Sequence, residues 1–363
     1  MRRFAQSRSM LSIGTLVAAL LVGCTPRAAA PAPPANPAPA APAAAPAAPA
    51  ASAPAATSAG PAPAAAPAGE PRKLRVGVSQ NVTIAPLAMA IEKGYIRDAG
   101  LELDLLPLTG GSEMVAPLST GELDVAIGGI SASLFNALAR GIDAKIVSDF
   151  SRMSRGHGFG AYVGRNGVDL PNIEANRGKR VGFNNPGAPC HYMVGKMLES
   201  AGLTVADVQV VNMPFQTIPG AMAKQEIDAA CAAEPWVANT IKAGDAHLVL
   251  TFDEIVPDME VSVVLISSQL ASERPVVERF LAALLKGAEL GRQQTPEVME
   301  VVSNYTKLDV GVLKDTIWTD MSRDGTVNEA SMKDQLDFFR RAGLMQGQVD
   351  LDHFIDMSYL PRR

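Results

Sequence analysis

The sequence predicts an α/β protein built from two similar lobes, each containing a mainly parallel β-sheet. From Lys73 onward, short β-prone runs alternate with amphipathic or alanine-rich stretches, which is typical of strand–helix–strand units. The same order of runs occurs twice, at an offset of 102 to 105 residues, which indicates an internal repeat. From Ser272 the chain has only helical patterns, so these last helices must pack on sheets formed earlier.

The first copy of the repeat begins at Arg75. Its β-prone runs predict strands at residues 75–79, 101–108, 124–128 and 144–150. The stretches between them predict helices at residues 85–95, 112–120 and 131–140. Pro86 suits the first turn of the first helix, and Ser112 and Ser131 suit the N-caps of the other two. For each serine taken alone, capping is a simpler interpretation than ligand binding.

Three sequence matches define the second copy. They are RVGVSQN at Arg75 with RVGFNNP at Arg180, Ala-Gly-Leu at Ala99 with the same tripeptide at Ala201, and Glu122-Leu123-Asp124 with Glu226-Ile227-Asp228. Matches at nearly one offset favour two similar lobes over chance recurrence of common strand–helix patterns. A further strand is expected at residues 261–267, and final helices at residues 275–292, 296–305, 310–321 and 329–342.

Residues 1–24 are a candidate export signal. Arg2, Arg3 and Arg8 precede an apolar run of thirteen residues from Met10 to Val22, shorter than the roughly 20 residues that a membrane-spanning helix needs. The run ends in Leu21-Val22-Gly23-Cys24, which resembles the bacterial lipobox. That resemblance implies lipid on the Cys24 sulfur and a protein anchored to the membrane on its extracytoplasmic side.

Residues 25–72 are expected to form a disordered tether. Of the 45 residues from 25 to 69, 24 are Ala and 13 are Pro, a composition that favours extended, solvated backbone over a packed core. All acidic residues follow this segment, so the chain from Glu70 carries 28 basic and 37 acidic residues, a net charge of −9 against −5 for the whole chain. This balance argues against a nucleic-acid partner.

Seven motifs between residues 73 and 345 carry a family resemblance. They are LRVGV at Leu74, Ala90-Ile91-Glu92-Lys93-Gly94-Tyr95, Ala99-Gly100-Leu101, Gly111-Ser112, Gly121-Glu122-Leu123-Asp124, Gly178-Lys179-Arg180-Val181-Gly182 and Glu234-Pro235. In this order and spacing they resemble the solute-binding proteins of bacterial ABC importers for nitrate, sulfonate and taurine, which include relatives that bind thiamine-pyrimidine precursors.

The resemblance implies a bilobal periplasmic-binding-protein fold of type II, with two doubly wound, mainly parallel sheets joined by two crossover strands. The first lobe is then residues 73–158 and 265–363, and the second is residues 159–264. The crossovers are expected at residues 159–165 and 261–267, with the glycine-rich residues 155–160 at the hinge. The implied protein is a monomer without a cofactor that captures a small organic solute between two closing lobes for an ABC permease and ATPase complex. The solute is expected to be a sulfonate, a carboxylate or an aromatic, pyrimidine-like molecule.

The predicted solute site lies at the loops that follow the strands, because open parallel sheets bind ligands at the carboxyl ends of their strands. Bare helix N–H groups at such loops suit a polar solute. The candidate contacts are Gln80, Asn81, Thr83, Gly111, Ser112, Gly129, Ile130, Ser131, Phe159, Asn184, Asn185, Gly187, Cys190, His191, Gln216, Thr217, Glu234 and Trp236.

One loop departs from the family pattern. Many relatives have Gly-Ser or Gly-Thr at the first helix of the second lobe, whereas this chain has Gly187-Ala188-Pro189. A hydroxyl and an N–H are therefore missing, which disfavours sulfonate or nitrate at this helix. Neighbouring amides and aromatic rings suit an aromatic, pyrimidine-like or carboxylate-bearing solute instead, although each ring alone is more simply a core residue.

Cys190 and Cys231 can pair in an oxidising compartment, but the alanine-rich surroundings of Cys231 favour a buried strand with a free thiol. The four histidines lack metal-ligand spacing, so no metal site is predicted.

Two other functions remain open from sequence. A tethered sensor for a membrane receptor would share all these features. An enzyme resembling the pyrimidine-precursor synthase of this fold is disfavoured, because the chain lacks that relative's cysteine-rich iron-binding motif and has no Gly-x-Ser-x-Gly, P-loop or His-Glu-x-x-His motif.

Overall fold

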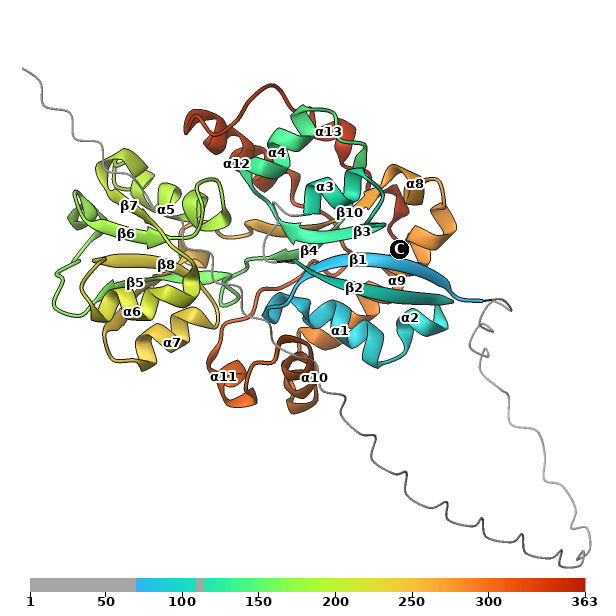
Figure 1. Cartoon of the computed structure of the whole chain (residues 1–363), viewed down its shortest axis with the longest axis horizontal. Coiled ribbons are helices and arrows are strands. Elements are labelled where there is room, and N and C mark those ends of the chain that lie inside the picture. Colours follow the sequence, from blue (N-terminus) through green and yellow to red (C-terminus); the bar gives the residue numbers. More distant parts are fainter. Residues whose placement is uncertain (1–69, 109–113, 363) are drawn as a thin grey trace, which may run out of the picture. The chain divides into compact units, whose positions relative to one another are not determined.

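The computed structural model describes residues 70–108 and 114–362 (Figure 1). The expected signal with Cys24, most of the expected tether, and the candidate contacts Gly111 and Ser112 lie outside the described residues. Within the described ranges, no helix combines the length and the apolar character needed to cross a membrane.

The first lobe contains a five-stranded sheet. Its strands are β1 (Arg72–Ser79), β2 (Leu101–Leu108), β3 (Val125–Gly129), β4 (Ala144–Arg152) and β10 (Glu260–Ser267), in the order β2-β1-β3-β10-β4. β1 pairs in parallel with β2 and β3, and β10 runs antiparallel between β3 and β4. β10 lies in this sheet along its whole length, whereas the expected boundary at residue 264 assigned its first residues to the second lobe.

The second lobe repeats this plan. Its strands are β5 (Gly160–Arg165), β6 (Arg180–Phe183), β7 (Gln209–Asn212), β8 (Ala229–Ala233) and β9 (Ala246–Thr251), in the order β7-β6-β8-β5-β9. β6 is parallel to β7 and β8, and β5 is antiparallel to β8 and β9. The chain crosses between lobes after β4 and again after β9, so each sheet receives one antiparallel strand. The predicted pair of mainly parallel sheets is confirmed.

Helices cover both sheets (Figure 1). Those that follow strands of the two repeats are α1 (Ala85–Glu92), α2 (Tyr95–Asp98), α3 (Val115–Ser119), α4 (Ala132–Ala139), α5 (Pro189–Glu199), α6 (Ile218–Ala223) and α7 (Trp236–Lys242). The C-terminal set is α8 (Ser268–Ala271), α9 (Arg274–Gly291), α10 (Pro296–Thr306), α11 (Val310–Asp315), α12 (Glu329–Arg341) and α13 (Leu351–Phe354).

Two predicted helices end earlier than the sequence suggested. The helix expected at residues 85–95 stops at Glu92, because Gly94 adopts a left-handed φ of 75°. The helix expected at residues 310–321 stops at Asp315. The Trp318 indole N–H donates to Thr316 Oγ1 at 2.8 Å, and Arg152 and Asp320 exchange two backbone hydrogen bonds. These contacts draw residues 316–321 away from a helical path.

The same fork of hydrogen bonds occurs in both lobes, at the residues that the repeat matches. In the first lobe the Arg75 backbone N–H and Nε donate to Asp124 Oδ2 at 2.9 and 3.0 Å, and Nη2 donates to Oδ1 at 2.9 Å. In the second lobe Arg180 makes the same three bonds to Asp228 at 2.9, 3.1 and 2.7 Å. We call these the Arg–Asp forks.

Each fork links one strand to the residue that directly precedes its parallel neighbour. Asp124 directly precedes β3, so its fork holds β1 beside β3 with Val76 opposite Val125. Asp228 directly precedes β8, so its fork holds β6 beside β8 with Val181 opposite Ala229. A slip of one residue would turn every buried side chain of a strand to the other face. The forks therefore fix which residues emerge at the carboxyl ends of these strands.

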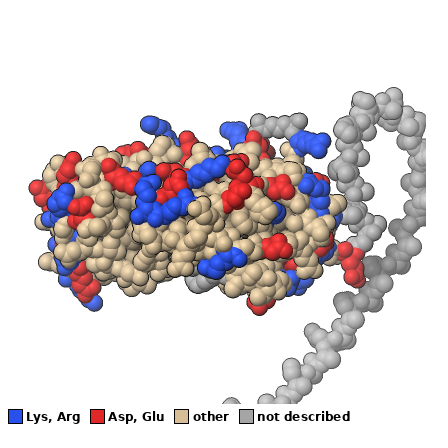
Figure 2. All heavy atoms as spheres, turned by 90° about the horizontal axis from the view of Figure 1, so that it is seen from above, with Lys and Arg blue, Asp and Glu red and all other residues tan. Residues whose placement is uncertain are grey.

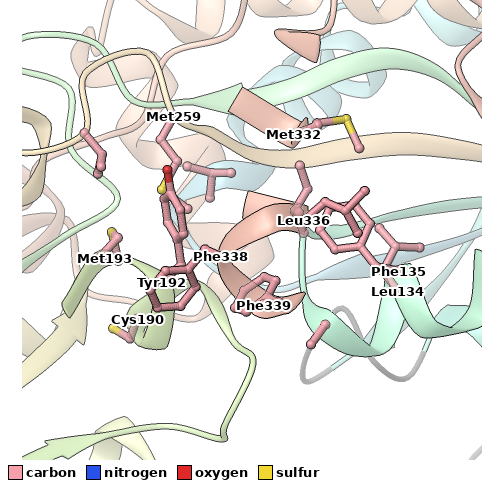
Figure 3. Close-up of a cluster of buried hydrophobic side chains, with 14 of the residues drawn as sticks. Leu134, Phe135, Cys190, Tyr192, Met193, Met259, Met332, Leu336, Phe338 and Phe339 are labelled. Carbon is pink, nitrogen blue, oxygen red and sulfur yellow. The ribbon is translucent and has the colours of Figure 1, made fainter. Parts of the chain in front are cut away.

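A shared hydrophobic cluster joins the two lobes through α12 (Figure 3). Phe339 on α12 lies 6.3 Å from the Phe135 ring on α4, and Phe338 lies edge-on to the Tyr192 ring on α5 at 5.4 Å. A Cβ added to Gly195 would lie 2.1 Å from Phe338 Cζ, so only glycine permits this approach. The Tyr192 hydroxyl also donates to Asp334. α12 therefore packs against helices of both lobes.

Surface charges contribute less to the fold. Figure 2 shows acidic and basic side chains interspersed on the visible face rather than gathered by sign. Several form pairs, such as Lys333 with Asp352 at 3.0 Å and Arg341 with Glu199 at 3.2 Å. Exposed pairs of this kind contribute roughly 0–1 kcal/mol each, so the packed clusters and the partly buried forks carry more of the stability.

We predict that Asp228→Asn lowers the free energy of unfolding by about 1.5 kcal/mol, because charge-assisted hydrogen bonds are lost. Hydrogen bonds from Arg180 lower the pKa of Asp228, so this stabilisation is present above the pKa of an unfolded aspartate, roughly 4, and is lost as the pH falls below it. Urea unfolding at pH 7 and pH 3 measures both effects. The exposed Glu226→Gln is the control, and equal stability of the two variants at pH 7 would contradict a role for the fork.

Candidate functional site

Five loops follow the carboxyl ends of β1, β3, β6, β7 and β8. They are residues 80–86, 129–133, 183–191, 213–217 and 233–237, and we call them the strand-end loops. The first two belong to the first lobe and the other three to the second. Open parallel sheets bind ligands at this edge, so these loops form the candidate site.

Strand-end loops from the two lobes touch directly. The Ala132 N–H, at the first position of α4, donates to the Gly187 carbonyl at 2.9 Å. Gly187 has a φ of +82°, and a Cβ there would lie 2.7 Å from Ala132 Cβ. A Cβ on Gly129 would lie 3.7 Å from Pro189 Cγ. The loop before α5 and the loop before α4 therefore meet, and Gly187 permits the contact through both its conformation and its size.

His191 stabilises the same loop from within α5. It is buried, and its Nδ1 accepts a hydrogen bond from the Gly187 N–H at 3.0 Å. The rings of Phe183 and Phe338 lie 5.4 and 5.8 Å from the imidazole. Burial lowers the pKa of His191, so the ring is neutral at pH 7 and, with Nδ1 accepting, carries its proton on Nε2.

Glu234 is the one carboxylate in the described strand-end loops, and it is 6% exposed. Its Oε2 accepts a hydrogen bond from the Ala238 N–H at 3.2 Å. Burial raises the pKa of Glu234, and the backbone N–H groups of Ala238 and Ile317 oppose that rise. Ile317 follows α11, in the C-terminal part of the chain, so segments far apart in sequence supply the surroundings of this carboxylate.

Several predicted contacts stabilise their own turns. Asn81 Oδ1 accepts hydrogen bonds from the Thr83 N–H and hydroxyl at 2.9 and 2.6 Å. Ser131 Oγ accepts from the Leu134 N–H at 3.3 Å and so caps α4, as the simpler interpretation expected. In contrast, Asn184 Oδ1 is buried and has no hydrogen-bond partner among the described residues.

The remaining predicted contacts differ in exposure. Gln80, Asn185, Gln216 and Thr217 are exposed, and the Asn185 N–H donates to Asn212 Oδ1 at 2.9 Å. Ile130 is completely buried. Phe159 and Trp236 are half-buried and pack against hydrophobic clusters, which is the core position that the simpler interpretation favours for single aromatic residues.

Cys190 and Cys231 form a disulfide, so the expectation of a free thiol on Cys231 is wrong. The S–S distance is 1.99 Å and the Cα atoms lie 5.8 Å apart. α5 packs on β8, which brings two cysteines separated by 41 residues into range, and no local pattern reveals this contact. Cys190 is completely buried and has no thiol for a solute. The disulfide instead attaches α5, with His191, to the central part of the second sheet.

Residues 316–321 were missed by sequence reasoning because the pattern there favours a continuous helix. Trp318 is 3% exposed, and its carbonyl lies 3.2 Å from His157 Nδ1 at the expected hinge. A cavity of about 20 Å³ is lined by Thr83 and Pro86 of the first strand-end loop together with Arg292, Trp318 and Asp320. The C-terminal segment therefore borders the first strand-end loop as well as Glu234.

A larger cavity, of about 190 Å³, lies elsewhere in the second lobe. It is lined by Tyr162, Leu170, Ile173, Met197 and Leu250, among others. None of its lining residues belongs to a strand-end loop. Within the described ranges, no three His, Cys, Asp or Glu side chains gather as they would around a metal ion.

A buried acidic pair lies where both crossover strands leave the first sheet. Asp149 on β4 and Glu260 on β10 are completely buried, and Arg152 Nε lies 3.1 Å from Asp149 Oδ2 while its Nη2 lies 3.7 Å from Glu260 Oε2. The other oxygen of each carboxyl, Asp149 Oδ1 and Glu260 Oε1, accepts no hydrogen bond from the described part of the chain. Burial raises the pKa of both carboxyls, and the Asp149 charge raises that of Glu260 further. One arginine between two buried carboxyls therefore favours uptake of a proton by the pair.

The fold and the facing loops define the class: this is the fold of periplasmic binding proteins. The structure is similar to the periplasmic aliphatic sulphonate binding protein SsuA of Escherichia coli, with a TM-score of 0.68 and 18% identity over 79% of this chain and 92% of that one. It is also similar to the periplasmic nitrate-binding protein NrtA of Synechocystis PCC 6803, with a TM-score of 0.62 and 15% identity over 80% and 87%.

The chain belongs to the NMT1-like family, whose model matches residues 67–295. A Brucella abortus (strain 2308) protein whose name describes a candidate binding protein is 27% identical over 282 residues, or 72% of this chain and 83% of its own length. A Bacillus subtilis (strain 168) protein, YtlA, with the same description is 25% identical over 181 residues, 49% of this chain and 53% of its own. The solute-binding family inferred from the motifs is thereby confirmed.

We predict that Asp149→Asn changes how stability depends on pH. A carboxyl whose pKa is raised by folding adds stability at pH values below the pKa it has in the unfolded chain. This contribution is lost as the pH rises through its folded pKa. Wild-type protein should therefore lose more stability than Asp149→Asn as the pH rises from about 4, by at most ~1.4 kcal/mol per pH unit for one proton. Chemical unfolding across pH 4–8 measures the difference, with the exposed Asp143→Asn as control. Parallel curves for wild type and Asp149→Asn would exclude uptake of a proton by the pair.

Proposed function

We propose that the protein is the extracytoplasmic solute-binding component of an ABC importer. One observation carries this proposal: strand-end loops from two lobes of the same topology meet directly, with Ala132 on one side and Gly187 on the other. Ligands of two-lobed α/β folds bind where such loops face each other. The names of the relatives, which describe binding rather than a reaction, support capture without catalysis.

The proposed cycle is a movement of the second lobe about the two crossovers. A solute held by loops of both lobes would favour the closed arrangement, and reopening would release it to a permease and ATPase complex. The contacts of α12 with α4 and α5 would limit this movement, because opening on that side would expose Phe338 and Tyr192. We place the solute contacts among the described candidates that are polar or lie at the meeting loops, such as Gly129, Asn184, His191 and Glu234.

Membrane attachment is part of the proposal. The lipobox at Leu21 to Cys24 is the supporting observation, and the alanine- and proline-rich residues 25–69 would let a monomer reach its permease. Extracytoplasmic location is consistent with the Cys190–Cys231 disulfide, because such bonds persist in oxidising compartments.

We predict that Gly187→Ala weakens binding of a solute at least tenfold, on the order of 1.4 kcal/mol, because the added Cβ would separate the meeting loops. Full-length protein is first screened against a small-molecule library by thermal shift, and a stabilising solute is then titrated calorimetrically with one-to-one binding expected.

Gly202→Ala is the matched control. Gly202 also has a left-handed φ, +68°, but no atom lies within 4 Å of the added Cβ. Both variants therefore carry similar backbone strain, and only Gly187→Ala disturbs the loop contact. Equal affinities of the two variants would remove the Gly187 loop from the site, and the absence of any bound solute would overturn the proposed function.

We predict that Cys24→Ser moves the protein from the membrane fraction to the soluble extracytoplasmic fraction, because one thiol would carry the lipid. Cell fractionation and incorporation of labelled palmitate measure the change. Ser52→Ala, in the same N-terminal region, is the control and should stay membrane-bound. A Cys24→Ser protein that still sediments with membranes would contradict the anchor.

A further inference from the structure

We propose that the solute carries N–H donors and no oxyanion: a neutral or cationic amine, amidine, amide or amino-heterocycle. This inference rests on the proposed solute-binding function and names the chemistry of that same site. It follows from the charges in the strand-end loops, from the hydrogen bonds that already occupy their helix N-termini, and from the acceptors that are left.

The described strand-end loops contain no cationic side chain. Residues 80–86, 129–133, 183–191, 213–217 and 233–237 include neither Lys nor Arg, and their single acidic residue is Glu234. His191 is neutral at pH 7 because burial lowers its pKa. An oxyanion buried among these loops would find no opposite charge on the loops themselves, and burial of an unpaired charge costs several kcal/mol. The nearby Arg292, which lines a cavity with Thr83, is already paired with Asp320 at 3.0 Å.

The N-terminus of α5 has few N–H groups to offer an anion. The Gly187 N–H donates to His191 Nδ1 at 3.0 Å, and the Ala188 N–H donates to the Asn185 carbonyl at 3.1 Å. Pro189 has no N–H, and the His191 N–H donates to the Ala188 carbonyl at 2.9 Å. The helix that the family resemblance places at the solute is therefore largely satisfied by its own loop.

Two other helix N-termini at these loops are partly occupied. In α4, the Ala132 N–H donates to Gly187 of the opposite lobe and the Leu134 N–H donates to Ser131. In α7, the Ala238 N–H donates to Glu234 at 3.2 Å, so a protein carboxylate already takes the place of an anionic ligand.

Two acceptors in these loops are buried. Asn184 Oδ1 is buried directly after β6 and has no partner among the described residues, and a buried polar atom normally has one. Glu234 lies at the equivalent position after β8 and is almost fully buried. An N–H donor would satisfy Asn184, and a cationic donor would also offset the cost of burying the Glu234 charge.

A matched series of probes separates the alternatives. Benzamidine, benzamide, benzoate and benzenesulfonate share one ring and differ in head group, and putrescine, adenine, nitrate and methanesulfonate extend the two classes. Thermal shift and titration calorimetry are performed on full-length protein. We expect stabilisation by N–H donors and none by the oxyanions.

Glu234→Gln should weaken binding of the cationic probes about tenfold or more, and binding of the neutral probes less. The exposed Glu226→Gln is the charge-matched control and should change neither.

Native mass spectrometry of the purified protein completes the test, because the exact mass of a non-covalent adduct gives its elemental composition. Stabilisation by benzenesulfonate, benzoate, nitrate or methanesulfonate, or an adduct without nitrogen, would overturn the donor inference and leave solute binding intact. Equal weakening by Glu234→Gln and Glu226→Gln would remove Glu234 from recognition. No stabilisation by any probe together with no adduct would overturn the proposed function itself.

Discussion

The duplicated Arg–Asp fork is the constraint on which the rest of the structure depends. In each lobe an arginine on the first strand donates three hydrogen bonds to the aspartate that directly precedes the third strand. Because side chains alternate along a strand, holding these two strands in register decides which residues reach the carboxyl edge of the sheet. The strand-end loops of the two lobes correspond because this register is the same in both.

The two lobes are not independent bodies connected only by a hinge. α12 contributes Phe338 and Phe339 to a cluster that also contains residues of α4 and α5, and Gly195 permits the closest of these contacts. On the other side, residues 316–321 lie near Glu234, His157 and Thr83. The buried Asp149–Glu260 pair lies at the exit of both crossovers. Movement of one lobe against the other would therefore cost packing contacts and hydrogen bonds.

The chemistry of the candidate site follows from how backbone groups are satisfied. The Gly187 carbonyl accepts from the Ala132 N–H of α4, and the Gly187 N–H donates to His191 on α5, so both polar groups of this residue are used. Loops that satisfy their own N–H groups lose the positive potential that binds anions in many α/β proteins. The acceptors Asn184 and Glu234 then dominate. Similar folds with sulphonate- or nitrate-binding names share the architecture at 15–18% identity, a level at which loop chemistry is free to differ.

The sequence alone determined the order of strands and helices, the internal repeat and the family, because hydrophobic periodicity and short motifs are local properties of the chain. It located Arg75, Asp124, Arg180 and Asp228 as matching positions without showing that they bond to each other. Only the tertiary structure decided the Cys190–Cys231 disulfide, the extended path of residues 316–321, and the hydrogen bond from the Ala132 N–H at the start of α4 to the Gly187 carbonyl. Each of these depends on residues tens to hundreds of positions apart coming within bonding distance, and no local pattern carries that information.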